Sequence, residues 1–224
     1  PSGAIGWIVS EEAFMQPLRK VISKLKLRAS YGQVGNANLG GRRFAYLSTI
    51  TDDYETLNMY KWGLDSSYGL TGMAEGEFAV QDLTWEIVNK MNLGVELGFL
   101  NGMIDLQLDY FDERRKDIFM PREFVPMTAG FMKQPWKNFG KVTNQGVEVS
   151  LNVNKQFGKD LFVSLMGTFT YAHNEITEKD EPSAVVGTNR AETGHPVGQL
   201  TGYIAEGLFT ADDFEDVSTG KLKE

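Results

Sequence analysis

Hydrophobic and polar residues alternate with a period of two along several stretches of the chain. In the clearest stretch, Leu93, Val95 and Leu97 alternate with Gly94 and Glu96. The same alternation recurs in four further stretches, less cleanly in the last: residues 25–31, 104–110, 147–153 and 161–171. Successive side chains of a strand point to opposite faces of a sheet, so each stretch predicts a strand with one apolar and one polar face. The pattern predicts an all-β chain.

The two faces of these strands differ strongly in polarity. Asp105, Gln107 and Asp109 would form an unusual wall for a dry core and instead suit a face that lines water. In a soluble sheet the apolar face packs on another layer, whereas in a membrane barrel it faces lipid and the polar face lines the lumen. We expect these residues to face a lumen: Glu96, Asp105, Gln107, Asp109 and Glu148. We expect these to face lipid: Leu93, Val95, Leu97, Leu106, Leu108, Val147, Val149 and Leu151.

Short and long connections alternate between the expected strands. Asn101-Gly102 is a strong signal for a type I′ hairpin turn, and residues 154–160, with Gly158, form a second short turn. Long polar connections run over about residues 32–82, 112–137 and 173–200. Antiparallel strands joined in this way place the tight turns on one rim and the long loops on the other. Outer-membrane barrels have this arrangement, with antiparallel up-and-down strands.

Bulk composition narrows the class of protein further. The 224 residues include 42% hydrophobic and 23% charged residues, which is typical of a folded protein. The net charge of −8 argues against a nucleic-acid partner, because phosphates attract basic surfaces. No apolar run reaches the length of a membrane-spanning helix. The first ten residues lack a signal peptide, so we interpret the chain as a fragment of a longer protein.

Candidate catalytic and metal-binding residues are few. The chain has no cysteine, which excludes disulfides, thiolate metal sites and cysteine nucleophiles. Its two histidines, His173 and His195, do not form a paired motif that could bind zinc. The acidic pairs at residues 52–53, 112–113 and 212–213 are adjacent in sequence, which does not bring carboxylates together across a cleft. We therefore expect no enzyme activity, no cofactor and no metal.

Six sequence blocks, in order along the chain, resemble one family. They are Gly6-Trp7 with residues 10–15, Leu25 to Asn36, residues 83–86 with Asn92 to Phe99, residues 109–118, Asn138 to Glu148, and Gly194 to Gly198 with residues 202–209. Together they are similar to the barrel of SusC/RagA-type TonB-linked (TonB-dependent) outer-membrane transporters. The resemblance implies a piece of a large transmembrane β-barrel of about 22 strands, without the plug. One block would be weak evidence, but the ordered set covers nearly the whole chain.

The resemblance also implies a function and partners. The complete protein would import a bulky nutrient, an oligosaccharide or a peptide, across the bacterial outer membrane. It would work with a SusD-like surface lipoprotein as a lid and with the TonB complex as energy source, and its barrel would contact the lipid bilayer. Substrate and lipoprotein contacts would lie on the long-loop rim.

Large aromatic residues in the long connections are the candidate contacts on that rim. We single out Tyr60, Trp62 and Trp136, because amphipathic rings can anchor a sugar or a partner protein. The same rings can equally pack the loops against one another. The alternative for the whole chain is a soluble or surface β-sandwich that binds carbohydrate or acts in adhesion. A sandwich would bury the apolar strand faces between two sheets, whereas a barrel leaves them on the outside.

Overall fold

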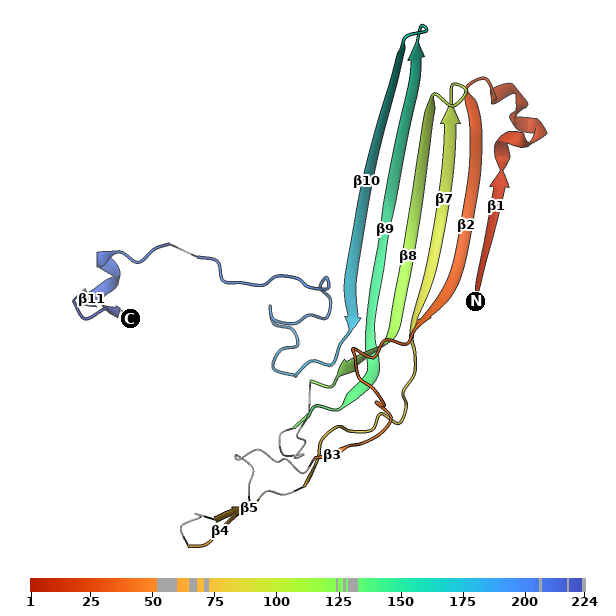
Figure 1. Cartoon of the computed structure of the whole chain (residues 1–224). Coiled ribbons are helices and arrows are strands. Elements are labelled where there is room, and N and C mark those ends of the chain that lie inside the picture. The colour runs from red at the N-terminus through yellow and green to blue at the C-terminus, as the bar shows by residue number, and fades with distance from the viewer. Residues whose placement is uncertain are drawn as a thin grey trace.

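A six-stranded antiparallel sheet dominates the computed structural model of the chain (Figure 1). The structure describes residues 1–51, 60–64, 68–70, 73–123, 125–126, 128, 133–205, 207–216 and 218–222. The sheet has the order β1-β2-β7-β8-β9-β10. Its strands are β1 (Ser2–Ile8), β2 (Ile22–Asn36), β7 (Glu86–Phe99), β8 (Ile104–Pro121), β9 (Trp136–Phe157) and β10 (Leu161–Glu178). Each strand pairs with the next one in this order, which confirms the predicted antiparallel up-and-down topology.

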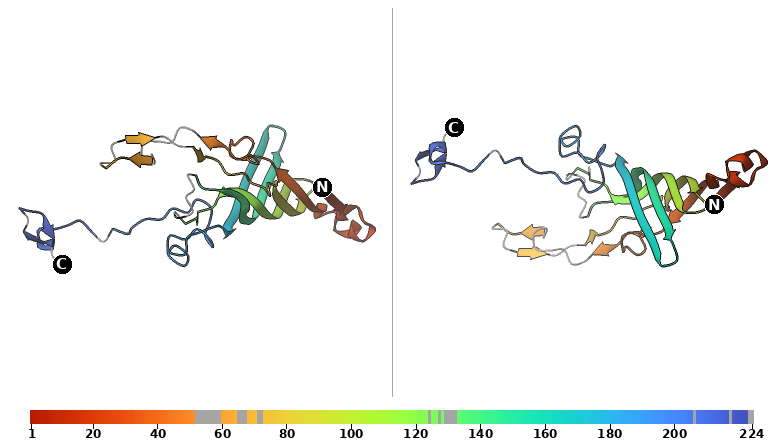
Figure 2. Two further views of the ribbon diagram at one scale, coloured as in Figure 1. Left: turned by 90° about the horizontal axis from the view of Figure 1, so that it is seen from below. Right: turned by 90° about the horizontal axis from the view of Figure 1, so that it is seen from above.

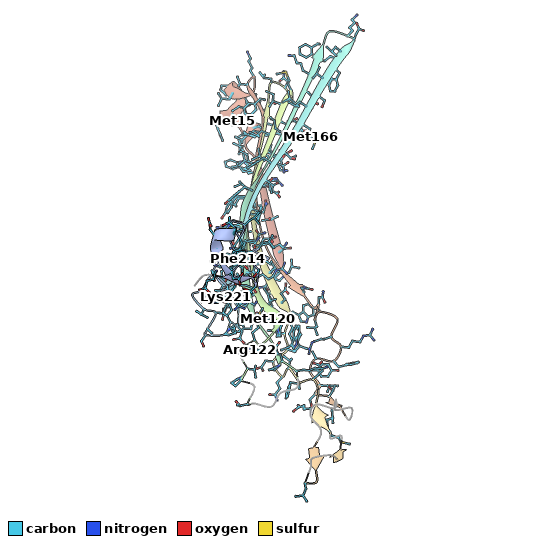
Figure 3. The ribbon with its side chains drawn as sticks, turned by 90° about the vertical axis from the view of Figure 1, so that its left-hand side faces the viewer. Met15, Met120, Arg122, Met166, Phe214 and Lys221 are labelled. Carbon is cyan, nitrogen blue, oxygen red and sulfur yellow. The ribbon has the colours of Figure 1, made fainter. Side chains whose placement is uncertain are left out.

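The connections separate into two kinds at the two ends of the sheet (Figure 1). One end carries the turns at residues 100–103 and 158–160, together with the 3₁₀ helices η1 (Val9–Glu11) and η2 (Ala13–Leu18) between β1 and β2. The long connections after β2, β8 and β10 leave from the opposite end. Met15 and Met166 lie toward the short-turn end, and Met120 and Arg122 toward the loop end (Figure 3). The side-by-side strands therefore present a short-turn rim and a long-loop rim.

Asn101 and Gly102 close the hairpin between β7 and β8. Their φ angles of 57° and 82° are both positive, as a type I′ turn requires. Leu100 also has a positive φ of 53°, which the sequence did not suggest because leucine rarely adopts this conformation. The last ladder pair is Phe99 with Ile104, so the turn spans four residues.

The long connections contain further short strands and a 3₁₀ helix. The β2–β7 connection contains β3 (Ile50–Thr51) paired with β6 (Ala74–Glu75), and β4 (Tyr60–Trp62) paired with β5 (Tyr68–Leu70). After β10 the chain runs away from the sheet toward η5 (Ala211–Asp213), β11 (Phe214–Asp216) and β12 (Lys221–Leu222), as Figure 2 shows.

The strands extend into ranges that we expected to be connections. β2 continues to Asn36, β8 to Pro121 and β10 to Glu178. On β8 the reason is a bulge, because Asp117 has a positive φ of 57° and the register with β9 shifts between Arg115 and Ile118. A bulge breaks the period of two, so the alternation that predicts strands from sequence stops before the strand itself does.

The molecule has very little core. Its accessible surface is 16986 Å², whereas a compact monomer of 25.0 kDa exposes about 10,000 Å². Among the described residues, the buried hydrophobic side chains are Val9, Met15, Ala45, Val80, Val88 and Ile176. In the described part of the chain, no second sheet packs on the six-stranded one, as a β-sandwich would require. The apolar face of the sheet therefore lacks the protein layer that would bury it in a soluble fold.

Candidate lumen wall and loop rim

The ladder register sorts the predicted strand residues onto two faces. Directly opposed residues of antiparallel strands share a face. Val95, Leu108 and Val149 lie side by side on β7, β8 and β9, and so do Leu97, Leu106 and Leu151. On the other face, Glu96 lies beside Gln107, and Asp109 beside Glu148. We refer to these as the apolar face and the polar face.

The apolar face is open to its surroundings. Leu93, Leu108 and Val147 are exposed although they lie on central strands. A shallow hollow between β1 and β9 on this face is lined by large hydrophobic residues: Ile5, Trp7, Leu27, Leu93, Val95, Leu108, Tyr110, Val147 and Val149. An exposed apolar surface of this extent marks contact with a membrane or another protein.

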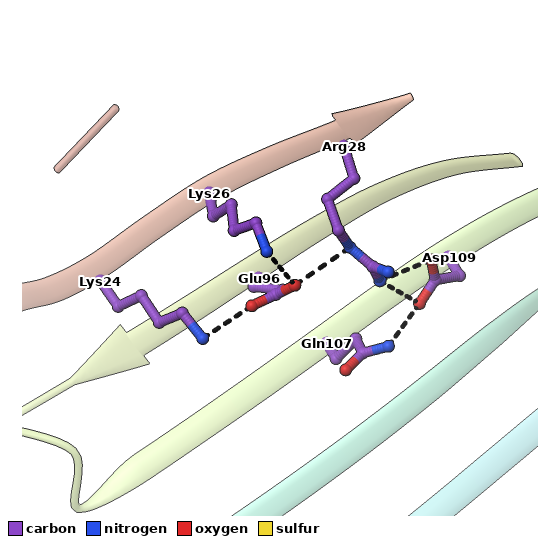
Figure 4. Close-up of polar contacts among 6 residues, drawn as sticks. All are labelled: Lys24, Lys26, Arg28, Glu96, Gln107 and Asp109. Carbon is purple, nitrogen blue, oxygen red and sulfur yellow. Dashed lines mark hydrogen bonds and ion pairs between the residues drawn. The ribbon is translucent and has the colours of Figure 1, made fainter. Parts of the chain in front are cut away.

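The polar face carries a network of charges centred on β2 and β7 (Figure 4). Three cations of β2 reach a single carboxylate: Lys24 Nζ lies 2.6 Å from Glu96 Oε2, and Lys26 Nζ and Arg28 Nε lie 3.4 and 3.0 Å from Glu96 Oε1. The Arg28 Nε–H does not point along a hydrogen bond to Glu96. Its contact with Glu96 is therefore one of charge rather than a directed bond.

Arg28 also crosses the neighbouring strand to reach β8. Its Nη2 donates to both oxygens of Asp109, at 2.8 and 3.0 Å, and Gln107 Nε2 donates to Asp109 Oδ2 at 2.8 Å (Figure 4). The Asp109 side chain is buried beneath these donors. Gly94 of β7 lies between the two strands, and a Cβ there would be 2.6 Å from Asp109 Oδ1 and 2.8 Å from Arg28 Nη2. The glycine therefore provides the space that the ion pair occupies.

The remaining part of the polar face carries hydroxyl and amide groups. Asp105 and Glu148 have no ion pair among the residues that the structure describes. Beside them, Ser150 opposes Gln107 and Thr168, and Thr170 opposes Glu148. The wall is thus cationic along β2, acidic along β7 and β8, and mostly uncharged along β10. Such a surface suits contact with water and polar solutes.

Trp136 lies at the base of the long-loop rim, between two neighbours. The Arg42 guanidinium lies over its ring, 4.3 Å from the centroid, and the Phe119 ring lies 5.1 Å away. Arg42 comes from the β2–β7 connection, whereas Trp136 begins β9. A cation over an indole face is a favourable contact. Trp136 therefore joins two loops that are far apart in sequence.

Glu77 strengthens the same junction. Its Oε2 lies 2.5 Å from Arg42 Nη1, and its Oε1 lies 2.8 Å from Lys133 Nζ. The hydrogen bond from Lys133, followed by the charge of Arg42, lowers the pKa of the Glu77 carboxyl below its ordinary value, against the opposing effect of burial. We call Arg42, Glu77, Lys133 and Trp136 the loop clamp.

A second junction ties the β8–β9 connection to the segment after β10. Arg122 Nε lies 2.5 Å from Asp180 Oδ2. Lys179 Nζ lies 3.1 Å from Glu123 and 2.9 Å from Glu192. Burial opposes the charge of Lys179, but its hydrogen bonds to Glu192 and Glu123 outweigh burial and raise the pKa of the lysine. The β8–β9 connection is therefore tied to a neighbouring connection on each side.

The other two rim candidates, Tyr60 and Trp62, begin and end β4, away from the loop clamp. Their side chains lie outside the described part of the structure. Trp136 is half-buried between Arg42 and Phe119. Sequence reasoning did not single out Arg42 or Glu77. No local signal indicated their partners, because Glu77 lies 35 residues from Arg42 and 56 from Lys133.

Among the described residues, no cluster of His, Asp and Glu could hold a metal ion. Within the same residues, no helix is long and apolar enough to cross a membrane.

A curved up-and-down sheet with one apolar and one polar face, a short-turn rim and a long-loop rim, is a section of a β-barrel wall. The family model described as TonB dependent receptor-like, beta-barrel matches residues 1–213. The chain therefore belongs to the TonB-dependent receptor β-barrel family, whose members are outer-membrane receptors and transporters rather than enzymes.

Relatives and solved structures agree with this assignment. The TonB-dependent receptor SusC of Bacteroides thetaiotaomicron is 34% identical over 181 residues, covering 80% of this chain and 17% of that protein. The TonB-dependent receptor P39 of Formosa agariphila is 29% identical over 214 residues, covering 95% of this chain and 19% of that protein. The chain thus spans about a fifth of the length of these relatives.

Two solved structures have the same fold. The RagAB peptide importer in its closed-closed state superposes with a TM-score of 0.65 at 23% identity, covering 87% of this chain and 20% of that one. The RagAB peptide transporter superposes with a TM-score of 0.61 at 25% identity, covering 79% and 18%. These matches confirm the all-β barrel fold that the sequence resemblance predicted.

Proposed function

We propose that the intact protein imports a bulky nutrient, an oligosaccharide or a peptide, across the bacterial outer membrane. It works with a SusD-like surface lipoprotein as a lid and draws energy from the TonB complex. The observation that carries the proposal is a sheet with one apolar and one polar face, and with short turns at one end and long loops at the other, in a chain of the TonB-dependent receptor family. The RagAB peptide transporter, whose fold this chain shares at 25% identity, supports a peptide as one of these ligand classes.

The dimensions of the apolar face fit a bilayer. On β10, the side chains that share this face run from Leu161 to Tyr171. These ten steps of about 3.3 Å span about 33 Å of strand, or about 25 Å of height at a tilt of about 40°. Outer-membrane barrels carry an outward apolar band about 25 Å tall. We therefore assign Leu93, Val95, Leu97 and their neighbours to the lipid-facing side of the wall. The hollow on this face would hold acyl chains.

The polar face then lines the lumen. Glu96, Asp105, Gln107, Asp109 and Glu148 all lie on it. The long-loop rim faces the cell exterior and receives the ligand, with Tyr60, Trp62 and Trp136 as candidate contacts. Import by this protein involves capture, rearrangement of a plug and passage through the lumen, with no covalent chemistry.

An uptake assay tests the proposal. Cells with the full-length gene, cells that lack it and cells that lack TonB are given fluorescent oligosaccharides and peptides too large for porins. We expect accumulation of one ligand class only when both the gene and TonB are present, together with a lipoprotein in the purified complex. Equal accumulation in all three strains would contradict the proposal.

A further inference from the structure

The two ends of the β8–β9 connection are joined to each other by a backbone hydrogen bond. The Arg122 amide donates to the Pro135 carbonyl at 2.8 Å, directly beyond the last ladder pair, Pro121 with Trp136. The bond fixes Arg122 beside Trp136, although the whole connection separates the two residues in sequence. We call residues 121, 122, 135 and 136 the crossbar. Both junctions of the long-loop rim meet at this narrow base.

The loop clamp attaches the crossbar to the β2–β7 connection. The Arg42 guanidinium lies over the Trp136 ring, 4.3 Å from its centroid. Lys133 Nζ, close to the crossbar in sequence, lies 2.8 Å from Glu77 Oε1. The Glu77 carbonyl in turn accepts from the Thr49 amide at 3.0 Å. The clamp therefore continues into the backbone hydrogen bonds of the β2–β7 connection.

Arg122 attaches the crossbar to the segment after β10. Its Nε lies 2.5 Å from Asp180 Oδ2, and the neighbouring Glu123 Oε1 lies 3.1 Å from Lys179 Nζ. The side chains of Asp180 and Lys179 are only 13% and 14% exposed, so salt screens these ion pairs less than it screens pairs at an open surface. Lys179 Nζ also lies 2.9 Å from Glu192 Oε1, which ties this segment to itself.

We propose that the long-loop rim opens as one cooperative unit, in which the crossbar transmits opening between the β2–β7 connection and residues 174–197. Folded proteins open in contiguous cooperative groups of residues, and the contacts across the crossbar make these segments one such group. A ligand or partner that holds one connection closed then also stabilises the other, because coupling between two sites is reciprocal. The inference concerns movement of the rim and does not depend on the identity of the imported ligand.

Hydrogen exchange in the full-length protein tests the cooperative unit at two reporter amides. The Val80 amide donates to the Ala45 carbonyl at 2.9 Å and reports on the β2–β7 connection. The Gly194 amide donates to the Ile176 carbonyl at 2.8 Å and reports on the segment after β10. The Asn154 amide, hydrogen-bonded at the opposite, short-turn rim, serves as the reference for the barrel.

Arg122→Gln removes the ion pair with Asp180 without changing a residue of the β2–β7 connection. We expect exchange to accelerate about fivefold at both the Val80 and the Gly194 amide, and not at the reference amide. The matched control is Lys141→Gln, which removes an exposed ion pair with Glu178 between β9 and β10 and should leave the Val80 amide unchanged. Acceleration at Gly194 alone, or equal acceleration at all three amides, overturns the proposal.

Glu77→Gln provides the measurement in the opposite direction. It removes the charge that Arg42 and Lys133 share, so the loop clamp is weakened at the far side of the crossbar. In a single cooperative unit, exchange should accelerate by the same factor at Val80 and at Gly194. An effect of Glu77→Gln that is confined to Val80 would show that the connections open separately, and the crossbar would then have no coupling role.

Discussion

Arg28 and Asp109 form an ion pair across a strand that belongs to neither of them. Arg28 lies on β2 and Asp109 on β8, yet Arg28 Nη2 is 2.8 Å from Asp109 Oδ1, above Gly94 of β7. The pair links β2 to β8, and the contact of Arg28 with Glu96 adds β7, so side chains link three strands in addition to their backbone ladders. Its geometry depends on the absence of a side chain at residue 94.

Gly94→Ala should therefore weaken the wall. A Cβ would lie 2.6 Å from Asp109 Oδ1 and 2.8 Å from Arg28 Nη2, so the ends of both side chains must shift and the ion pair is weakened. We expect a loss of about 1 kcal/mol of stability, measured by the temperature at which the folded full-length barrel changes its mobility on a gel. The control is Gly167→Ala on β10, where an added Cβ meets no atom within 4 Å. Equal effects of the two substitutions would contradict the role of Gly94.

The strand faces and the hairpin at Asn101-Gly102 were predictable because alternation and turn chemistry are local properties. The loop-side ends of the strands were not. β2 continues past Gly32 because it stays paired with β7 as far as Asn36, and Gly35 leaves room for the ring of Trp85, which a Cβ would approach to 2.6 Å. β10 continues past His173 because it stays paired with β9 as far as Glu178, and Asn174 and Ile176 also bond to residues 194–197. Such long-range partners leave no periodic trace in the sequence.

Only the part of the candidate site that depends on local sequence patterns was predictable. Residue types on the polar face followed from alternation, whereas the pairing of Arg28 with Asp109, 81 residues apart, did not. At the rim, an aromatic residue in a loop indicates either an anchor or a packing contact, and only the position of Arg42 shows that Trp136 has a stacking partner.

Single cysteines can test the assignment of the two faces, since the chain itself has none. In a full-length importer without other cysteines, we expect fluorophores at Val95 and Leu108 to be quenched by lipid-borne nitroxides. Fluorophores at Glu96 and Gln107, adjacent positions on the other face, should be quenched by water-soluble agents instead. The reverse pattern would show that the apolar face does not contact lipid.

Acidification should open the loop clamp. The pKa of the Glu77 carboxyl is lowered in the folded protein by the hydrogen bond from Lys133 and by Arg42. A lowered folded pKa means that the stabilising contribution is complete above the ordinary value of 4.5 and is lost as pH falls through the lower, folded value. Hydrogen exchange of residues 37–51 should therefore accelerate below about pH 4.5. Glu77→Gln should give fast exchange at every pH, and a persistent pH step in that variant would contradict the assignment.

Replacement of the rim tryptophans should separate anchoring from packing. Trp136→Ala removes the ring between Arg42 and Phe119, so we expect proteolysis of the β2–β7 connection to increase. Trp62→Ala should reduce ligand uptake or lid binding, by about 2 kcal/mol if the ring is an anchor. Barrel assembly should persist in both variants, because neither residue lies within the apolar band. Failure of Trp62→Ala to assemble would make that residue structural.

The chain expressed alone in water should aggregate. It exposes 16986 Å², including apolar residues of both edge strands, such as Ile5 of β1 and Phe169 of β10. Unpaired edges and exposed apolar surface both promote association. Light scattering and denaturant melts would check this, and a monodisperse monomer with a cooperative transition would favour a soluble fold instead.

The backbone hydrogen bonds of Ile176 limit the length over which another strand can pair with β10. The Ile176 amide donates to the His195 carbonyl at 2.9 Å, and the Gly194 amide donates to the Ile176 carbonyl at 2.8 Å. Both bonds lie on the side of β10 away from β9, and Asn174 Oδ1 nearby accepts from the Val197 amide at 2.7 Å. An incoming strand can therefore bond to the edge only from the short-turn rim up to about His173. The Gly-His-Pro segment therefore limits the length over which an adjoining strand can pair with β10.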